Sequence, residues 1–180
     1  SALTVGTAVA TDIAPYLKIA GSATGAAAGP ERLKDAILRG SALVPFFGII
    51  STEKPADALL LETAKTVQTM DKLWFVPSSG SADIKGVFTT ILNAGLTHTR
   101  CLYYSTSADD SFDFAAGYAG RGLSIDFARF NTAHTMHGKE VVGMVADPGM
   151  TQTILTDCKN AGVDFYGDFG VPKVFTSGAN

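Results

Sequence analysis

The sequence predicts an α/β fold, a mainly parallel or mixed sheet flanked by helices on both faces, with a C-terminal strand pair. Strand-like apolar runs alternate with amphipathic helical runs from about residue 30 onward. Parallel neighbouring strands need crossover connections, and helices of this kind supply them. Hydrophobic residues make up 46% of the chain and charged residues 17%, which is enough apolar material for a core. A length of 180 residues indicates a single domain, residues 1–180.

The first elements are expected between residues 2 and 51. Residues 2–21 indicate a short strand followed by a helix that begins near Thr11. Residues 29–40 predict a helix with Pro30 in its first turn and Gly40 at its end. The run LVPFFGIIS, residues 43–51, is nearly continuously apolar, which is typical of a strand covered on both faces.

The middle of the chain predicts helix, strand and helix. Residues 52–70 have helical periodicity, with Thr52 as the expected N-cap. KLWFVPSS, residues 72–79, reads as a strand. Residues 81–95 form the clearest helical pattern, which Ser81 can cap and Gly95 can end in a left-handed conformation. The residues expected to face inward from these two helices are Leu60, Ala64, Val67, Ile84, Val87, Phe88, Ile91 and Leu92.

The remaining elements follow the same alternation. TRCLYYST, from residue 99, predicts a strand, and residues 111–124 predict a helix that buries Phe114, Ala115, Tyr118 and Ala119. TMHGKEVVGMV, residues 135–145, is rich in β-branched residues and predicts a further strand. Residues 150–162 predict a last helix that ends at Gly162, and a closing strand pair follows around a glycine turn.

Composition excludes several functional classes. A net charge of −3 without a basic run argues against nucleic-acid binding. The apolar windows fall short of the roughly 20 residues that a membrane span needs. Cys101 and Cys158 lie far apart in apolar patterns, which favours buried free thiols over a disulfide. The chain begins with SALTVG and has no signal-peptide pattern, so we expect an excised fragment of a longer protein.

His134 and His137 are the first candidates for a site. On a helix, a spacing of three residues would put both rings on one side, as a zinc site requires. On the strand expected here the period is two, so the rings would point to opposite faces. No third ligand completes a motif such as HExxH. We therefore expect a pair of surface or interface strand residues without a metal.

Two loops could bind a ligand at the end of a strand. PSSGSADIKG, residues 77–86, joins a strand to a helix N-terminus, where anions bind readily, but it matches no phosphate-binding motif and Lys85 lies inside the helix. Asp109 and Asp110 follow the next strand and could hold a cation. Ser and Asp residues are also what a helix N-terminus favours, and capping explains both loops.

Catalytic patterns are not apparent in the sequence. It has no GxSxG elbow, and neither cysteine lies in a recognisable catalytic context. The aromatic residues Trp74, Phe75, Tyr103 and Tyr104 lie in apolar strands and are expected in the core. We assign no catalytic, cofactor-binding or metal-binding residue, and we expect a protein that is not an enzyme.

The order of patterns from Thr97 to Gly170 resembles the tail-sheath proteins of contractile-tailed bacteriophages. The matching pieces are an aromatic-Ala-Ala helix at residues 114–122, a strand at 135–145, a turn and helix at 147–162, and a strand and glycine hairpin at 163–170. GTAVATDIAPYL and the stretch of residues 42–79 resemble the earlier part of the same domain, so the resemblance covers about residues 7–178. The sequence departs from the pattern at His137-Gly138-Lys139, where the family has more apolar residues.

The resemblance implies a mechanical function. Sheath subunits stack around a tail tube and, when the baseplate triggers them, rearrange into a shorter and wider array that drives injection. Terminal arms tie neighbouring subunits together by adding strands to each other's sheets. This chain would be a core domain without those arms, monomeric or weakly associating by itself, and part of the virion after assembly in the host cytoplasm. The implied partners are other sheath subunits, the tail tube and the baseplate, with no nucleic acid, membrane or cofactor.

An alternative function uses the same fold. A Rossmann-like enzyme or nucleotide- or phosphate-binding domain would place its ligand at the loops of residues 77–86 and 105–111. A third possibility, an adaptor domain of another injection machine with this architecture, differs from the sheath only in context.

Overall fold

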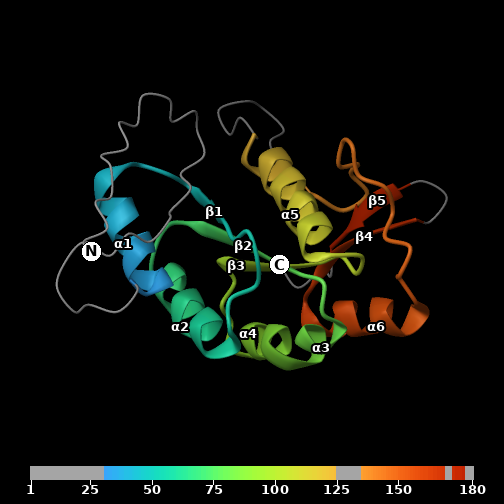
Figure 1. Cartoon of the computed structure of the whole chain (residues 1–180), viewed down its shortest axis with the longest axis horizontal. Coiled ribbons are helices and arrows are strands. Elements are labelled where there is room, and N and C mark those ends of the chain that lie inside the picture. The colour runs from blue at the N-terminus through green and yellow to red at the C-terminus, as the bar shows by residue number, and fades with distance from the viewer. Residues whose placement is uncertain (1–30, 125–134, 169–171, 177–180) are drawn as a thin grey trace, which may run out of the picture.

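The structure, a computed structural model, describes residues 31–124, 135–168 and 172–176. They form a five-stranded sheet of order β1-β2-β3-β4-β5 with helices on both faces, as Figure 1 shows. The strands are β1 (Gly48–Ile50), β2 (Leu73–Ser78), β3 (Thr99–Tyr103), β4 (Asp164–Asp168) and β5 (Pro172–Phe175). The first four strands are parallel, and β5 pairs with β4 antiparallel. The predicted fold class is therefore confirmed, including the C-terminal strand pair.

The helices divide unequally between the two faces. They are α1 (Leu33–Leu43), α2 (Asp57–Gln68), α3 (Ser81–Asp83), the π-helical segment η1 (Ile84–Phe88), α4 (Thr89–Asn93), α5 (Ala108–Leu123) and α6 (Gln152–Ala161). Buried residues of α1, α2, η1, α4 and α6 share one hydrophobic cluster, whereas α5 belongs to a second cluster. None of the described helices is long and apolar enough to cross a membrane.

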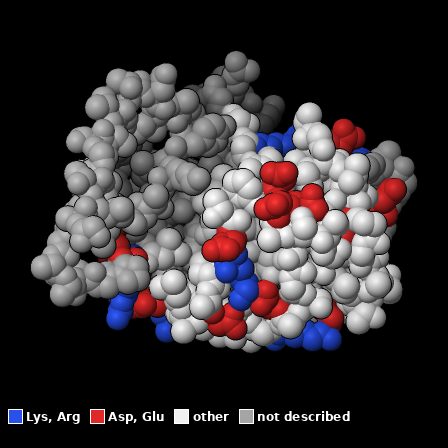
Figure 2. Space-filling view, viewed as in Figure 1, with Lys and Arg blue, Asp and Glu red and all other residues white. Residues whose placement is uncertain are grey.

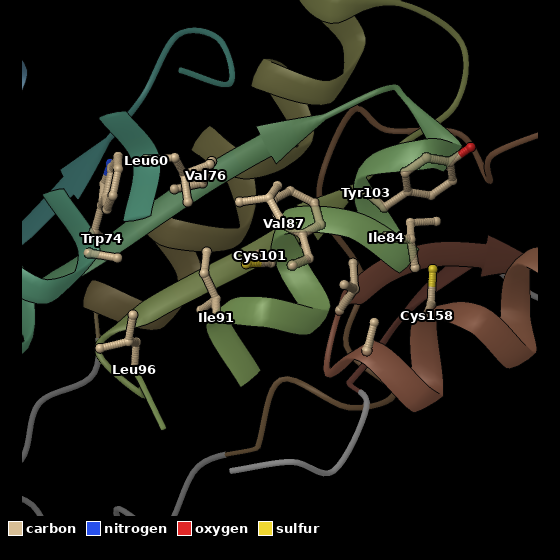
Figure 3. Packing of buried hydrophobic residues seen from close by; sticks show 14 of the residues in the cluster. Leu60, Trp74, Val76, Ile84, Val87, Ile91, Leu96, Cys101, Tyr103 and Cys158 are labelled. Atoms are coloured by element: carbon tan, nitrogen blue, oxygen red, sulfur yellow. The ribbon is translucent and has the colours of Figure 1, made fainter. Parts of the chain in front are cut away.

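The larger core lies between the sheet and the helical elements α2, η1, α4 and α6, which pack on one of its faces (Figure 3). Successive residues of a strand point to opposite faces, so Trp74 and Val76 of β2 enter this core while Phe75 between them enters the other. Trp74 and Val76 are fully buried. At roughly 2 kcal/mol for each large side chain removed from water, this cluster is the main apolar contribution to folding.

The smaller core lies beneath α5 and is rich in aromatic rings. Phe114 packs against Tyr104, Tyr118 and Tyr166, with ring centroids 5.9–6.2 Å apart. Met136 and Val141 also contribute to this cluster. The segment around them lies beside α5 and covers the part of the sheet that a single helix leaves open.

The connection from β3 to β4 changes faces. After β3 the chain forms α5 on one face, and it forms α6 on the other face before it enters β4. The return passes the carboxyl end of the sheet near Asp147, whose backbone N–H donates a hydrogen bond to the carbonyl of Tyr166 at 3.0 Å. The two earlier crossovers, through α2 and through α3, η1 and α4, both lie on the α6 face.

Most predicted elements are present. The inward residues predicted for α2 and α5 are all buried, as are Ile84, Val87, Phe88 and Ile91, whereas Leu92 is half-buried. Gly95 and Gly162 have φ values of 66° and 68°, as the predicted left-handed helix ends require. After α4, the N–H groups of Gly95 and Leu96 bond to the carbonyls of Leu92 and Ile91, which closes the helix in a Schellman motif.

The first strand differs from the prediction. Leu43 ends α1, and β1 contains only Gly48, Ile49 and Ile50. These three residues are half-buried at the edge of the sheet, so the prediction of a strand covered on both faces is wrong. The apolar residues Leu43, Val44 and Phe47 instead belong to the exposed end of α1 and the linker that follows it. Gly40 is buried inside α1 and does not end it.

Two helix starts were also predicted wrongly. Thr52 does not cap α2, which begins five residues later at Asp57, after Pro55. A residue that precedes proline is disfavoured in the α region, and this keeps Lys54 out of the helix. The N-cap of α3 is Gly80, so Ser81 is the first helical residue and makes no capping bond. The expected continuous helix is interrupted at Gly86, whose φ of −91° and ψ of −109° accompany the π-helical segment.

The strand predicted at residues 135–145 is a loop. In a strand, Val141 and Val145 would share a face, yet Val141 is buried and Val145 is 70% exposed. Gly138 and Gly143 have φ values of 73° and 84°, which interrupt an extended chain. Only a short stretch pairs with the sheet, through bonds from Gly138 to Val174 and from Val174 to Lys139. The β-branched residues here do not mark a strand: Val141 packs against α5, whereas Val142 and Val145 are exposed.

Some predictions lie outside the described residues. These are the strand and helix expected near Thr11, the placement of Pro30, and the position of His134.

Candidate functional site

The carboxyl ends of β2 and β3 form the place where an open α/β sheet can bind a ligand. The chain leaves β2 toward α3 on one face and leaves β3 toward α5 on the other, which makes this a topological switch point. The N–H of Tyr104 donates to the carbonyl of Ser78 at 3.1 Å, so the loops of residues 77–86 and 105–111 lie side by side (Figure 1). The two loops named by the alternative function are thus brought together.

On the β2 side of the switch point, polar groups bond to one another. The hydroxyl of Ser78 donates to Asp83 Oδ2 at 2.5 Å and accepts from the N–H of Gly80 at 3.0 Å. Lys54 Nζ lies 2.5 Å from Asp57 Oδ1 and 3.2 Å from Asp83 Oδ1. Partial burial disfavours the charged form of Lys54, but hydrogen bonds to Asp57 and Asp83 outweigh it and raise the pKa of this ammonium. Lys54 therefore stays charged and neutralises the carboxylates beside it.

On the β3 side, Asp147 joins the two halves of the β3–β4 connection. Its carboxylate accepts hydrogen bonds from the N–H of Ser105 at 2.7 Å, from the Ser105 hydroxyl, and from the N–H of Gly149 at 2.8 Å. The Asp147 residue is only 5% exposed. A Cβ on Gly149 would lie 2.1 Å from Ser105 Oγ, so the two loops approach too closely for any larger residue there.

The acidic pair predicted to follow this strand lies in the first turn of α5. Ser107 is the N-cap, and its hydroxyl accepts from the N–H of Asp110 at 3.0 Å and donates to Asp110 Oδ2 at 2.7 Å. Ser107 thus caps α5 through the N–H of Asp110, and the Asp110 carboxylate orients the capping hydroxyl. Asp109 is exposed beside it. The capping interpretation of Asp109 and Asp110 agrees with this geometry.

Two tyrosines at this end of the sheet are held protonated. Burial and the nearby charge of Asp147 raise the pKa of Tyr103 to about 12. Burial, followed by the charges of Asp147 and Asp110, also raises the pKa of Tyr104, whose hydroxyl donates to the carbonyl of Val145 at 3.0 Å. Trp74, Phe75 and both tyrosines are buried, as predicted for core residues.

The described residues do not assemble a nucleophile with a base. His98 lies before β3, at the opposite end of the strand from Ser105, and its Nδ1 is 2.8 Å from the carbonyl of Met70. Within the described ranges, His, Cys, Asp and Glu side chains form no group of three that could hold a metal ion. The serines and carboxylates at the switch point instead cap helices and fasten loops.

The histidine stretch is only partly described. His137 lies in the loop of residues 135–145, exposed, with its ring edge-on to Phe175 at a centroid distance of 5.4 Å. Its Nδ1 accepts from the N–H of Thr176 at 3.4 Å. The prediction of a surface position agrees with this placement, whereas the prediction of a strand is wrong. His134 lies outside the described residues, so the opposite orientation of the two rings stays a prediction.

Lys85 and the two cysteines contact other side chains of the fold and do not form a site. Lys85 lies in η1 and pairs with Asp157 of α6 at 3.0 Å. Cys101 and Cys158 are free and buried, as predicted, and Figure 3 shows both sulfur atoms among apolar side chains. Burial raises the pKa of Cys101 far above its ordinary range and, with the charge of Asp157, raises the pKa of Cys158 to about 12. Neither thiol is poised for nucleophilic attack.

Sequence reasoning missed the residues that organise the carboxyl end of the sheet. Asp147-Pro148-Gly149 was expected only as part of a turn, although Asp before Pro-Gly is typical of a turn whose carboxylate accepts backbone N–H groups. The bond from Lys54 to Asp83 offered no signal, because the two residues come from separate segments of the chain. The exposed apolar side chains of residues 135–145 were not predicted, because this segment was expected to be a strand of the sheet.

The five most exposed large apolar side chains of the described residues lie at two other places. Leu43, Val44 and Phe47, between α1 and β1, are 70%, 49% and 54% exposed. Val142 and Val145, in the loop beside α5, are 96% and 70% exposed. Figure 2 shows acidic and basic side chains interspersed on the face in view.

Comparison with known proteins gives no relative: no family model matches the chain, and a search of curated proteins finds no similar sequence.

Proposed function

We propose that this chain is the α/β core of a structural subunit of a contractile phage tail sheath. Such a subunit stacks around the tail tube and rearranges on contraction to drive injection. The order of sequence patterns that resembles the sheath family supports the proposal, and the α/β sheet with its closing strand pair is the fold that the resemblance implies.

One observation carries the proposal furthest. At the switch point, where this fold class binds small molecules, the polar groups are bonded to each other: Ser78 with Asp83, and Ser105 with Asp147. Large apolar side chains such as those of Phe47 and Val142 are instead exposed on the surface. This distribution favours a protein whose work is done by contacts with other subunits, the tail tube and the baseplate.

The proposal includes the setting. The subunit belongs to the virion and assembles in the host cytoplasm, and it needs no cofactor, nucleic acid or membrane. An isolated core domain without terminal arms is monomeric or weakly associating, because the arms supply strand addition between neighbours. An adaptor of another injection machine would share the fold and the contacts, and only its source would separate the two.

Electron microscopy tests the proposal. Under this proposal the chain is part of a longer sheath subunit, here called the parent protein, which is purified and viewed in negative stain with the 180-residue chain as control. Hollow striated tubes from the parent and dispersed particles from the chain are the expected result. Dispersed particles from both would contradict the proposal.

A Rossmann-like nucleotide- or phosphate-binding domain is the second candidate. The observation in its favour is the topological switch point between β2 and β3, with both predicted loops beside it. A thermal-shift screen with nucleotides, phosphosugars and divalent cations tests this candidate. A rise of several degrees with one ligand would support it, because a ligand that binds the folded state stabilises that state. Unchanged melting across the screen would leave the sheath proposal as the better account.

A further inference from the structure

The two exposed apolar sets lie at opposite ends of the sheet. Leu43, Val44 and Phe47, here called the α1–β1 patch, flank the edge strand β1. Val142 and Val145, here called the loop patch, lie beside α5 and near the other edge strand, β5, to which Gly138 bonds. Figure 1 shows α1 and β1 on the left and the orange chain around the loop patch on the right. Two unlike sites on opposite ends suit a head-to-tail contact between identical chains.

The loop patch is held in place by its neighbours. The buried side chain of Val141 packs on Gly117, so closely that a Cβ on that glycine would lie 2.3 Å from Val141 Cγ1. Arg121 Nη1 donates to the carbonyl of Glu140 at 2.7 Å, and Met144 N–H bonds back to Val141. The turn therefore presents Val142 at its tip from a fixed base. An exposed apolar side chain on a fastened turn loses little conformational freedom when a partner covers it.

Charges beside the two patches are complementary. Lys72 Nζ lies 5.1 Å from the ring centroid of Phe46, next to Phe47, and has no carboxylate partner among the described residues. The carboxylate of Glu140, two residues before Val142, likewise has no basic partner in the described part of the chain. A contact that covers Phe47 with Val142 brings the ammonium and the carboxylate to the same rim, where opposite charges steer association and fix register.

We propose that the loop patch of one chain docks on the α1–β1 patch of a second copy, with Glu140 facing Lys72 across the contact. This rests on the proposed function and names surfaces through which subunits meet. Five exposed apolar side chains cover far less than the roughly 800 Å² per partner of a stable interface. The contact is therefore weak in the isolated chain and gains strength only when it is repeated in an array.

Cysteine cross-linking between two variants tests the contact. Phe47→Cys is placed in one chain and Val142→Cys in a second chain of different mass, and disulfide formation is followed under mild oxidation. The native Cys101 and Cys158 are buried and do not compete. The matched control replaces Val142→Cys by Ala82→Cys, at an exposed position of α3 away from both patches. We expect the Phe47/Val142 pair to cross-link about tenfold faster than the Phe47/Ala82 pair, as a local contact raises effective concentration.

A charge exchange tests the register. Lys72→Glu in the Phe47→Cys chain is expected to slow cross-linking about threefold, and Glu140→Lys in the Val142→Cys chain is expected to restore the rate. All positions are exposed or half-buried, and unchanged melting temperatures verify that each variant folds.

Three results would overturn the proposal. Equal rates for the Phe47/Val142 and Phe47/Ala82 pairs would mean that the patches do not meet, for example because another part of the chain covers one of them. Faster self-cross-linking of Phe47→Cys than of the mixed pair would indicate a symmetric contact instead. A charge exchange that fails to restore the rate would exclude the stated register. If the parent protein forms tubes and any of these three results is obtained, the proposed sheath function is supported and only the proposed contact surfaces are wrong.

Discussion

At the scale of single residues, the carboxylate of Asp147 connects segments that are far apart in the chain. It accepts two backbone N–H groups and a hydroxyl from Ser105 and Gly149, and it is nearly inaccessible to water. Buried donors left without an acceptor cost the full penalty of their desolvation. The residue thus stabilises the point where the chain crosses from the α5 face to the α6 face.

Replacing Asp147→Ala should lower the free energy of unfolding by about 3 kcal/mol, because both backbone N–H groups lose their acceptor. Urea unfolding followed by circular dichroism measures this change. Asp113→Ala, at an exposed position in α5, is the control and should change stability by less than about 0.5 kcal/mol. Equal effects of the two substitutions would contradict the role assigned to Asp147.

The buried thiol of Cys158 and the buried phenol of Tyr103 should make the free energy of unfolding fall at alkaline pH. Burial, with nearby carboxylate charges, raises the pKa of Cys158 from 9.0 to about 12 and that of Tyr103 from 10.0 to about 12. Above pH 9 the unfolded chain releases these protons while the folded chain keeps them, so the unfolded state binds fewer protons and stability falls as pH rises. The stabilising effect is complete below pH 9 and is lost as pH approaches 12.

Urea unfolding at pH 7, 9 and 10.5 measures this slope. Cys158→Ala removes one titrating group, so its free energy of unfolding should decline less steeply between pH 9 and 10.5 than that of the parent chain. Parallel slopes for the two proteins would show that Cys158 does not titrate differently in the folded and unfolded states.

At the scale of elements, α5 and the 135–145 loop cover the second face of the sheet together. Two glycines of α5 report on this packing because their surroundings differ. A Cβ on Gly117 would meet Val141 at 2.3 Å, whereas a Cβ on Gly120 would meet nothing within 4 Å. The loop therefore needs a glycine at one of the two positions and not at the other.

Alanine at these glycines should have effects of opposite sign. Gly120→Ala should stabilise the protein by about 0.5–1 kcal/mol, since alanine is the better helix former. Gly117→Ala should destabilise it by about 1–3 kcal/mol, because the loop must move away from the helix. Thermal unfolding of the two variants is the measurement. Stabilisation by both would mean that the loop does not pack on α5 as described.

Elements with a strong period could be predicted from the sequence, and elements fixed by tertiary contacts could not. The stripes of α2 and α5 and the glycine ends of α4 and α6 follow from local chemistry, and the structure has them. The strand predicted at residues 135–145 is a loop, because β-branched residues favour a strand only in a suitable context, and contacts with Gly117 and Val174 decide the path of this segment. The prediction that β1 is covered on both faces was wrong for a related reason. An apolar run in the sequence does not show whether other elements pack on both faces of the strand.

The candidate site shows the same division. Capping by Ser107 and the free cysteines could be predicted because each depends on nearby residues. The bonds from Lys54 to Asp83 and from Ser105 to Asp147 join separate loops, so no local pattern announces them. The proposed function rests on the resemblance of sequence patterns. The structure adds that polar groups at the switch point, such as those of Ser105 and Asp147, are hydrogen-bonded to each other.

At the scale of the whole molecule, the two ends of the sheet differ in the part of the chain that the structure describes. β1 is parallel to its neighbour and bordered by exposed apolar side chains, whereas β5 is antiparallel and bonded to the 135–145 loop. Unlike ends suit repeated head-to-tail contacts, and closed or helical arrays both follow from such contacts. The array in the proposed function is helical, around a tube.

The isolated chain should sediment as a monomer at micromolar concentration, because the proposed contact buries little surface. Analytical ultracentrifugation over a concentration series measures this. A tight dimer at micromolar concentration would contradict a weak contact that depends on repetition.

The most direct test of the sheath proposal is a cryo-electron-microscopy reconstruction of whatever the purified parent protein assembles into. The account predicts a hollow helical tube in which each subunit contains this five-stranded sheet as a rigid unit around a central channel. Subunits that remain dispersed under all assembly conditions, or a closed particle with a ligand bound between β2 and β3, would contradict it.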